Sequence, residues 1–415
     1  MKFKKKRVLI LDPHDRRVIP TLGSLGKEYD FHFLIPLRKG FAFQKAVEAT
    51  LRLCRPRNTR SISFLSFITE EEFKQGLIDF FKRHFMDAVL PYSERSTAII
   101  LSMKSEIEEE VVVPFGSLED FQILNDKYLV ARIANEQSIP TPNFKLIENG
   151  KALTKVSEIG FPVVLKCCKA SGVNEALRIC QDYDEVEQAY NHLSGREVPY
   201  SLFPCDQLVA QEFIEGKIYD ACFAVKDGQV LAGMSQVREW TIPVSGGFGA
   251  YNITKKVPEI IEYGRRLFES IPWTGPAQLE FIFDKKTKKY KLIEVNPRFW
   301  GTMGLSIKAG VNFPKYILEA GFNGKLQPSP NVKDGIEFRW LLQETLAAEI
   351  LQGKGKVTIG KHLLRVLSRQ IDNFSYSILM NFIISIPFII SALKGKNAMS
   401  STDNEANSLA KRLFL

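Results

Sequence analysis

The segment Leu292-Ile-Glu-Val-Asn-Pro-Arg-Phe-Trp-Gly301 alternates apolar and polar side chains and then reaches a proline. Side chains of a β-strand point to alternate faces of the sheet, so Glu294 and Asn296 share one face. The valine between them points to the other face, into the core. The pattern predicts a half-buried strand whose polar face carries a carboxylate and an amide.

A second strand pattern lies just upstream of this segment. The run Gln278-Leu-Glu-Phe-Ile-Phe283 leads into residues 284–289, whose composition suits a turn. If the two runs pair as a hairpin, Glu280 joins the same polar face. Two carboxylates and an amide oxygen suit Mg²⁺, and Arg298 could neutralise a transferring phosphoryl group. The alternative, which stays open on these residues alone, is a polar hairpin face that contacts only water.

Two other segments suit a nucleotide, and each has an ordinary structural alternative. Lys166 ends the apolar strand pattern of residues 162–166, where it could contact a phosphate or simply extend to water. Residues 169–173 follow, and the backbone N–H groups of this short loop could cover phosphates. The run Leu208-Val-Ala-Gln-Glu-Phe-Ile-Glu-Gly216 could offer backbone hydrogen bonds to adenine and a carboxylate to a ribose. It is equally compatible with any strand end.

The composition is that of a globular protein. The chain has 415 residues, of which 45% are hydrophobic and 25% charged, and this length predicts two to four domains. The net charge of +9 is concentrated at the ends, with +10 in residues 1–60 and +6 in residues 351–415. Basic ends can meet nucleic acid or anionic lipid, but no aromatic-studded nucleic-acid module is present. We therefore expect no nucleic-acid partner.

The cysteine pattern argues against a disulfide scaffold. Six cysteines occur in the chain, two of them adjacent at Cys167 and Cys168, and none has C-x-x-C spacing. A structural zinc site is therefore not expected. A reducing, intracellular compartment fits this usage best.

The order of the strand and helix patterns predicts α/β plus α+β architecture. Residues 1–122 alternate strands with helices, as a parallel α/β domain does, but contain no glycine-rich dinucleotide fingerprint. Residues 123–325 begin with a helix, pass through the double proline of Ile139-Pro-Thr-Pro142, and then become rich in strands. Residues 326–415 are expected to form a basic, apolar C-terminal extension.

The extension contains residues 374–393, a run of 20 residues without a charge. Its length suffices for a membrane span, but serines, an asparagine and a proline dilute it. A helix that lies in the interface of an anionic membrane, next to basic residues, fits better. A tail packed on the protein's own surface is the third alternative, and all three stay open.

Taken together, these motifs resemble the ATP-grasp superfamily, and within it the carbamoyl-phosphate-synthetase-like carboxylate–amine ligases. The resemblance covers roughly residues 7–325. Its most specific part is the segment 292–301 followed by Ala-Gly-Val-Asn-Phe-Pro314, and Asn125-Asp-Lys127 is an independent match. It implies that residues 123–325 form a two-lobed ATP-grasp domain, with a small lobe at about residues 150–212.

The resemblance also implies site roles, residue by residue. Lys127 and Lys166 correspond to the lysines that contact the nucleotide phosphates. Ser171 and Gly172 lie in the loop that covers the phosphates, and this loop contains fewer glycines than is usual for the family. The adenine segment corresponds to Gln211, Glu212, Phe213 and Ile214, with Glu215 as the ribose contact, although the acidic residue usual a few positions later is Ile218 here. The magnesium ligands correspond to Glu280, Glu294 and Asn296. The catalytic positions correspond to Arg298 near the γ-phosphate and to Arg238, which with residues 243–248 resembles a substrate-side loop.

The reaction implied by the resemblance is activation of a carboxylate by ATP with Mg²⁺, for which Mn²⁺ could substitute. An amine then attacks the acyl phosphate, and an amide, ADP and phosphate are formed. The implied partners are a small-molecule carboxylate, an amine and a second copy of the chain in a homodimer. We expect a cytoplasmic location. If the extension binds lipid, the protein would be peripheral at the inner face of the membrane. Two alternatives are carried: carbamoyl-phosphate-type or carboxylase-type activation of a small acid, and a non-catalytic ATP-binding regulator at a membrane surface.

Overall fold

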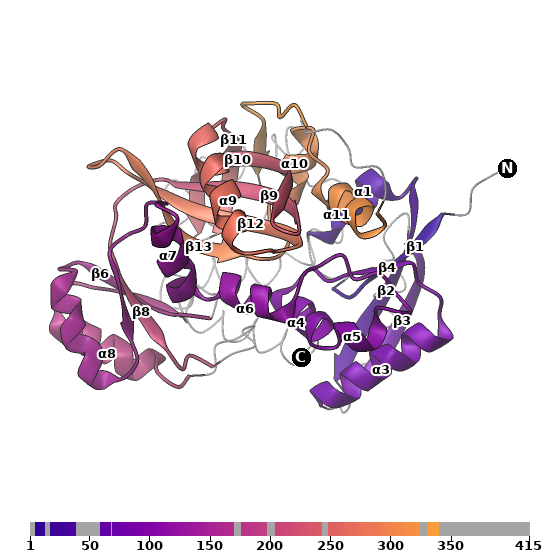
Figure 1. The fold of residues 1–415 in the computed structure, drawn as a ribbon, viewed down its shortest axis with the longest axis horizontal. Coiled ribbons are helices and arrows are strands. Elements are labelled where there is room, and N and C mark those ends of the chain that lie inside the picture. Colours follow the sequence, from indigo (N-terminus) through magenta and orange to yellow (C-terminus); the bar gives the residue numbers. More distant parts are fainter. Residues whose placement is uncertain are drawn as a thin grey trace, which may run out of the picture.

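The computed structural model contains three β-sheets, which Figure 1 shows side by side. The part of the chain that the structure describes comprises residues 5–12, 17–38, 59–67, 69–169, 176–196, 204–242, 248–323 and 330–339. Three predictions fall outside it: the covering loop with Ser171 and Gly172, residues 243–247 of the proposed substrate loop, and the uncharged run of residues 374–393. Among the described residues, no helix has the length and apolar character needed to cross a membrane.

The first sheet is parallel and has the strand order β3-β2-β1-β4. Its strands are β1 (Lys6–Ile10), β2 (Tyr29–Arg38), β3 (Thr59–Phe67) and β4 (Ala88–Leu90). The helices of this part are α1 (Val18–Leu25), α3 (Glu70–Arg83), α4 (Glu94–Ser102) and α5 (Lys104–Ile107). The parallel α/β architecture predicted for the start of the chain is therefore confirmed.

Two helices lead from the first sheet to the rest of the molecule, α6 (Leu118–Asn125) and α7 (Lys127–Glu136). Asp126 separates them, and its side chain accepts hydrogen bonds from the backbone N–H groups of Tyr128 and Leu129. It is therefore the N-cap of α7. This cap fixes Lys127 as the first residue of the helix.

The second sheet is small and antiparallel, with the order β5-β8-β6-β7. Its strands are β5 (Phe144–Ile147), β6 (Val163–Cys167), β7 (Leu177–Cys180) and β8 (Leu208–Glu212). The 3₁₀ helix η1 (Gly150–Glu158) and α8 (Tyr183–Leu193) pack against it. Its buried residues form a cluster separate from the main core, so this lobe packs as a unit of its own.

The third sheet has six strands in the order β13-β12-β9-β10-β11-β14. The strands are β9 (Ile218–Lys226), β10 (Gln229–Ile242), β11 (Phe248–Thr254), β12 (Gly275–Asp284), β13 (Lys289–Asn296) and β14 (Glu337–Arg339). They are accompanied by α9 (Pro258–Ser270), α10 (Met303–Lys308) and α11 (Phe313–Gly321). One hydrophobic core runs from this sheet into the first, and the stacked rings of Tyr92 and Phe299, 4.7 Å apart, join the two parts.

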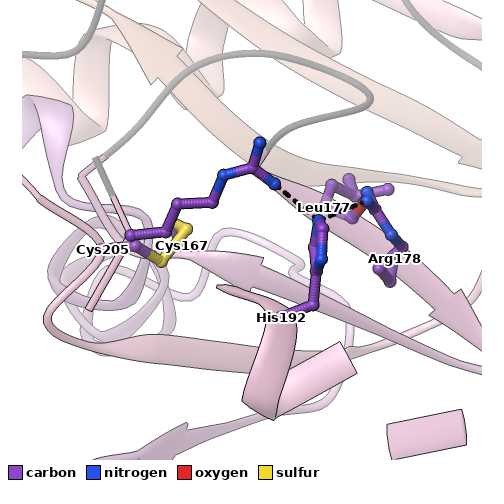
Figure 2. The surroundings of a disulfide bond; sticks show 6 residues. Cys167, Leu177, Arg178, His192 and Cys205 are labelled. Atoms are coloured by element: carbon purple, nitrogen blue, oxygen red, sulfur yellow. Dashed lines mark hydrogen bonds between the residues drawn. A yellow bond between two sulfur atoms is a disulfide. The ribbon is translucent and has the colours of Figure 1, made fainter. Parts of the chain in front are cut away.

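A disulfide bond between Cys167 and Cys205 joins the end of β6 to the chain that enters β8 (Figure 2). The sequence argument, which excluded a disulfide scaffold, did not anticipate this single bond. Nearby, His192 lies within hydrogen-bond distance of the Arg178 side chain. Burial lowers the pKa of His192, and the positive charge of Arg178 lowers it further.

Candidate functional site

The predicted hairpin is present as strands β12 and β13, and its register brings the polar residues together. Glu280 lies opposite Glu294, and Gln278 lies opposite Asn296. Directly opposed residues of an antiparallel pair point to the same face, so both carboxylates and the amide face the same way. The Asn296 Nδ2 donates to Oε1 of Glu280 over 3.0 Å, which ties the two strands together at this point.

An irregularity in the hairpin lies next to the two carboxylates. The register shifts after Glu280, because Phe281 pairs with Leu292 and leaves Ile293 unmatched. Such a bulge releases backbone groups from the ladder. Here the Nζ of Lys166 lies 3.4 Å from the Ile293 carbonyl oxygen, so the lysine at the end of β6 reaches the large sheet.

Two lysines face Glu294 from different elements. Lys127, at the start of α7, places its Nζ 3.8 Å from Oε2 of Glu294. Lys166 is 6% exposed, and burial lowers its pKa to about 8, although Glu294 acts in the opposite direction. Burial by itself would raise the pKa of Glu294, but the positive charges around it, above all Lys127 and Lys166, together hold that pKa below its ordinary value.

Arg238 lies in strand β10 rather than in a loop. Its guanidinium binds Asp220 of β9 through two hydrogen bonds, of 2.6 Å from Nη2 and 3.1 Å from Nε. The same Nη2 lies 2.5 Å from Oε1 of Glu280. Burial raises the pKa of Glu280 to about 7 even though Arg238 opposes the shift. The arginine thus lies within the polar face of the sheet, in contact with one of the proposed metal ligands.

Arg298 lies beside Asn296, at the end of β13. Its Nη2 donates to Oδ1 of Asn296 over 2.9 Å, and its Nη1 donates to the Phe299 carbonyl oxygen over 3.2 Å. The guanidinium is therefore oriented by two acceptors of its own strand end. It lies on the same face as the two carboxylates and the lysines.

The proposed adenine segment leaves strand β8 at Glu212. Gln211 is only 2% exposed, and its Nε2 has no hydrogen-bond partner among the residues described. A buried amide donor without a partner is costly, and a bound ligand would satisfy it. The backbone N–H groups of Glu212 and Phe213, in contrast, already donate to protein carbonyl oxygens.

The two carboxylates of this segment, Glu212 and Glu215, differ in their surroundings. Glu215, the proposed ribose contact, is exposed. Glu212 accepts from Lys291 of β13, whose Nζ lies 3.2 Å from Oε2 of Glu212 and 3.2 Å from Oδ2 of Asp284. Lys291 therefore links the adenine segment to the hairpin that carries the proposed metal ligands.

The donor set of the hairpin suits Mg²⁺. Glu280, Glu294 and Asn296 supply hard oxygen donors on one face, and the positive charges of Lys127 and Lys166 lie close to Glu294. Oε1 of Glu280 contacts Arg238 and accepts from Asn296. The residues therefore fit the ion that the sequence pattern predicted.

Sequence reasoning missed three residues that hold this face in place. Asp220 is fully buried and accepts two hydrogen bonds from Arg238. Gln236 donates to Asp220 over 2.8 Å and accepts from Thr302 over 2.9 Å. The sequence offered one signal, the acidic residue Asp220 directly before the apolar run Ala221–Val225. A charged side chain in a buried strand requires a partner.

Asn125 provides a further connection that the sequence did not reveal. Its Nδ2 donates to Oε1 of Glu94 over 2.9 Å and to the Lys169 carbonyl oxygen over 3.2 Å. The backbone N–H of Lys127 donates to the Cys168 carbonyl oxygen over 2.9 Å. The junction of α6 and α7 thus holds the chain that leads out of β6.

Comparisons with known proteins agree with this architecture. Residues 205–344 match a family described as ATP-grasp in the biosynthetic pathway with Ter operon. A carbamoyl-phosphate synthase of Methanobrevibacter smithii is 23% identical over 241 residues, covering 55% of this chain and 61% of that protein. A D-alanine–D-alanine ligase of Pelotomaculum thermopropionicum is 25% identical over 223 residues, covering 46% of this chain and 65% of the relative. The chain thus spans less than two thirds of the length of each of these curated relatives.

A solved structure shows the same fold. The biotin carboxylase domain of a 2-oxoglutarate carboxylase from Hydrogenobacter thermophilus, in complex with MgADP, ADP and bicarbonate, superposes with a TM-score of 0.62. The alignment has 18% sequence identity and covers 79% of this chain and 72% of that domain. At this identity the likeness concerns the arrangement of the sheets.

Proposed function

The chain belongs to the ATP-grasp superfamily, and we propose that it is an ATP-dependent carboxylate–amine ligase. It phosphorylates a small-molecule carboxylate with ATP and joins the resulting acyl phosphate to an amine, which yields an amide, ADP and phosphate. The observation that carries the proposal is the in-register pair Glu280 and Glu294, faced by Lys127, Lys166 and Arg298.

The first step is an in-line attack of a carboxylate oxygen on the γ-phosphorus of ATP. The new O–P bond forms as the bond to the β,γ-bridging oxygen breaks, and ADP leaves. Lys127 and Lys166 bind phosphate oxygens, and Arg298 stabilises the charge of the transferring group. When bound by Glu280, Glu294 and Asn296, Mg²⁺ would neutralise phosphate oxygens, and Mn²⁺ suits the same donors.

In the second step the amine nitrogen attacks the acyl carbon, phosphate departs, and the nitrogen loses a proton. The acyl phosphate must be shielded from water until the amine arrives. The small lobe has its own core and is connected to the site through Lys166 and residues 211–215, so it can close over the nucleotide as a unit. In this proposal Gln211 to Ile214 bind adenine, Glu215 binds the ribose, and Ser171 and Gly172 cover the phosphates.

Carbamoyl-phosphate-type or carboxylase-type activation of bicarbonate or another small acid is the second candidate. The similarity to a carbamoyl-phosphate synthase favours it. The two candidates differ in the acid that is activated, because only the ligase needs an organic carboxylate together with an amine. Bicarbonate-dependent release of ADP in the absence of any amine would replace our proposal with this one.

The test is ADP release by the purified protein with Mg·ATP and pools of amino acids, small carboxylates and amines. We expect turnover that requires one member of each class. Glu294→Gln should lower the rate more than about 100-fold, because it removes a ligand, and even outer partners of a metal site are worth 10–100-fold. Glu262→Gln, at an exposed carboxylate of α9, should retain the rate. ATP binding without turnover in any pool would count against a ligase and favour a non-catalytic regulator.

We propose a cytoplasmic location and a homodimer for this enzyme, with no nucleic-acid partner. We further propose that the C-terminal extension contacts anionic membranes, because Lys361, Arg365 and Arg369 precede the uncharged run of residues 374–393. The full chain should sediment with anionic vesicles in a manner that weakens with added salt. Deletion of residues 360–415 should abolish this, and unchanged binding would refute the membrane contact. Light scattering on the purified chain tests the dimer.

A further inference from the structure

A cavity of about 370 Å³ lies where the first domain meets the third sheet. Its walls come from segments that are distant in the sequence: α5, residues 112–117, the turn between β9 and β10, the loop that leads into β12, and the end of α11. Small-molecule sites of proteins typically measure about 300–1,000 Å³. The cavity therefore has room for a small metabolite, and none of the residues that we assign to the proposed reaction lines it.

Two lysines, one from each side of this junction, bring positive charge to the cavity. Lys104 of α5 donates from Nζ to the backbone carbonyl oxygens of residues 115–116, over 2.8 and 3.3 Å. Lys226, at the end of β9, donates to the Ala320 carbonyl oxygen over 3.3 Å and to Oδ1 of Asn323 over 3.0 Å. Both lysines are half-buried, and within the described part of the chain neither forms an ion pair.

The partners of both lysines are neutral. A carbonyl or amide oxygen helps to solvate an ammonium group but does not balance its charge. Each ammonium has three N–H donors and uses two of them here, so one donor of each lysine remains for a ligand. The cavity thus offers two positive charges and two hydrogen-bond donors to an anion.

One carboxylate also lines the cavity, that of Asp227 in the turn after β9. Its Oδ1 accepts from the Thr274 hydroxyl over 3.0 Å, and its backbone N–H donates to the same hydroxyl oxygen over 2.8 Å. Two lysines against one carboxylate leave the lining positive. A ligand that carries hydroxyl groups as well as negative charge matches this mixture, because its hydroxyls can donate to Asp227.

We propose that this cavity is a binding site for a small phosphate ester of a polyhydroxy compound, with the phosphate contacted by Lys104 and Lys226. A phosphate dianion balances two ammonium groups, and lysine binds phosphate as a point charge. Carboxylates are more typically recognised by the planar fork of arginine, and the described lining contains no arginine. The inference goes beyond the proposed function and does not depend on it.

The position of the cavity gives such a ligand a structural effect. The backbone N–H of Gly116 donates to the Thr274 carbonyl oxygen over 2.7 Å, which already joins the first domain to the chain that enters β12. A phosphate held by Lys104 and Lys226 adds a second connection across the same junction. Because the ester binds the folded chain, it should raise the melting temperature in proportion to its occupancy.

The test is calorimetric titration of glucose 6-phosphate into the full chain saturated with Mg·ADP, so that the nucleotide site is already filled. We expect one molecule bound per chain, weaker binding of inorganic phosphate and no binding of glucose. Lys104→Gln and Lys226→Gln should each raise the dissociation constant about tenfold or more, the range lost with one charged hydrogen bond. Glutamine can still donate to the carbonyl oxygens, so both variants should fold. Lys82→Gln, at an exposed lysine of α3, makes the same charge change away from the cavity and should bind like wild type.

Lys104→Arg keeps the positive charge and should retain most of the affinity. If Lys104→Gln unfolds at a lower urea concentration, Lys104→Arg and Lys226→Gln still separate charge from folding. Equal affinity of both glutamine variants and wild type would overturn the proposal, as would the absence of binding by the wild type, and the lysines would then only tie the two domains together. Equal affinity for phosphate and its ester would overturn the assignment of an ester.

Discussion

Arg238 and Glu280 form a buried ion pair, in which Nη2 and Oε1 are 2.5 Å apart and the side chains are 8% and 11% exposed. The arginine belongs to β10, two strands away from β12, and reaches Glu280 across Asp220 of β9. The position of a proposed metal ligand is therefore set by two residues of neighbouring strands. Burial raises the pKa of Glu280 to about 7, and the positive charge of Arg238 counteracts this shift, so the ionisation of Glu280 depends on the ion pair.

Asp220→Asn should destabilise the protein strongly. The amide cannot balance the guanidinium of Arg238, and breaking a buried pair on one side typically costs about 3–5 kcal/mol. We expect the free energy of unfolding, from urea titration, to fall by this amount, and Mg·ATP-dependent turnover to fall with it because Glu280 loses its orientation. The exposed control Glu262→Gln should stay within about 0.5 kcal/mol of wild type. A loss below about 1 kcal/mol for Asp220→Asn would mean that Arg238 is satisfied by Glu280 alone.

Nucleotide affinity should decline as the pH rises through 8. Burial lowers the pKa of Lys166 to about 8 in the free protein, whereas a bound phosphate favours the charged ammonium and raises that pKa. Binding therefore takes up a proton above pH 8, and the dissociation constant of Mg·ADP should rise by up to about tenfold per pH unit between pH 8 and 9. Below about pH 7, a full unit under that pKa, the lysine is charged in both states, and this dependence should disappear.

Lys166→Arg is the control for this pH dependence. An arginine stays protonated throughout the range, so the variant should bind Mg·ADP with a flat profile between pH 7.5 and 9. Calorimetry on both proteins in the same buffers removes any contribution from the nucleotide's own titration. If the dissociation constant of Mg·ADP changes with pH in the same way in both proteins, the protonation of Lys166 is not linked to nucleotide binding.

The local part of the site could be predicted from the sequence. Glu280, Glu294 and Asn296 lie on two strands joined by a short turn, so alternation and hairpin pairing suffice to bring them onto one face. Lys166 could be placed at a strand end for the same reason. Its contact with Ile293 depends on a bulge in the hairpin, and no residue type marks that bulge.

The long-range part could not be predicted. Asp220 and Arg238 meet because β9 and β10 pair in one particular register, and the sequence pattern allows several. Strand β3 pairs with β2 along most of its length, and no short-range pattern of the sequence specifies that pairing. The partner of Cys167 could not be deduced either, since connectivity among cysteines does not follow from their positions.

Gly216→Ala should disturb the adenine segment. A Cβ at this position would lie 2.2 Å from the Phe283 carbonyl oxygen, and neither backbone can yield without moving the segment away from β12. Overpacking of this kind costs about 1–3 kcal/mol. We expect that loss in the free energy of unfolding together with weaker binding of Mg·ADP. Gly150→Ala is the matched control, because its nearest neighbour, Cε1 of Tyr190, would lie at an ordinary 3.7 Å. Equal behaviour of the two variants would contradict the close approach at Gly216.

Reduction of the Cys167–Cys205 bond should loosen the small lobe next to Lys166. The bond closes a sequence separation of 38 residues, for which the chain-entropy model gives about 3–4 kcal/mol. We expect dithiothreitol to lower the urea midpoint of the wild-type protein and to weaken Mg·ADP binding, since Lys166 directly precedes the bonded cysteine. The free thiols of Cys168 and Cys180 are buried, which raises their pKa to about 12 and about 11, so they supply little thiolate to exchange with the bond. Cys205→Ser should have the urea midpoint of the reduced wild-type protein, and dithiothreitol should not change it. If the substitution lowers the midpoint but dithiothreitol has no effect on the wild type, the stability comes from packing around Cys205 rather than from the bond.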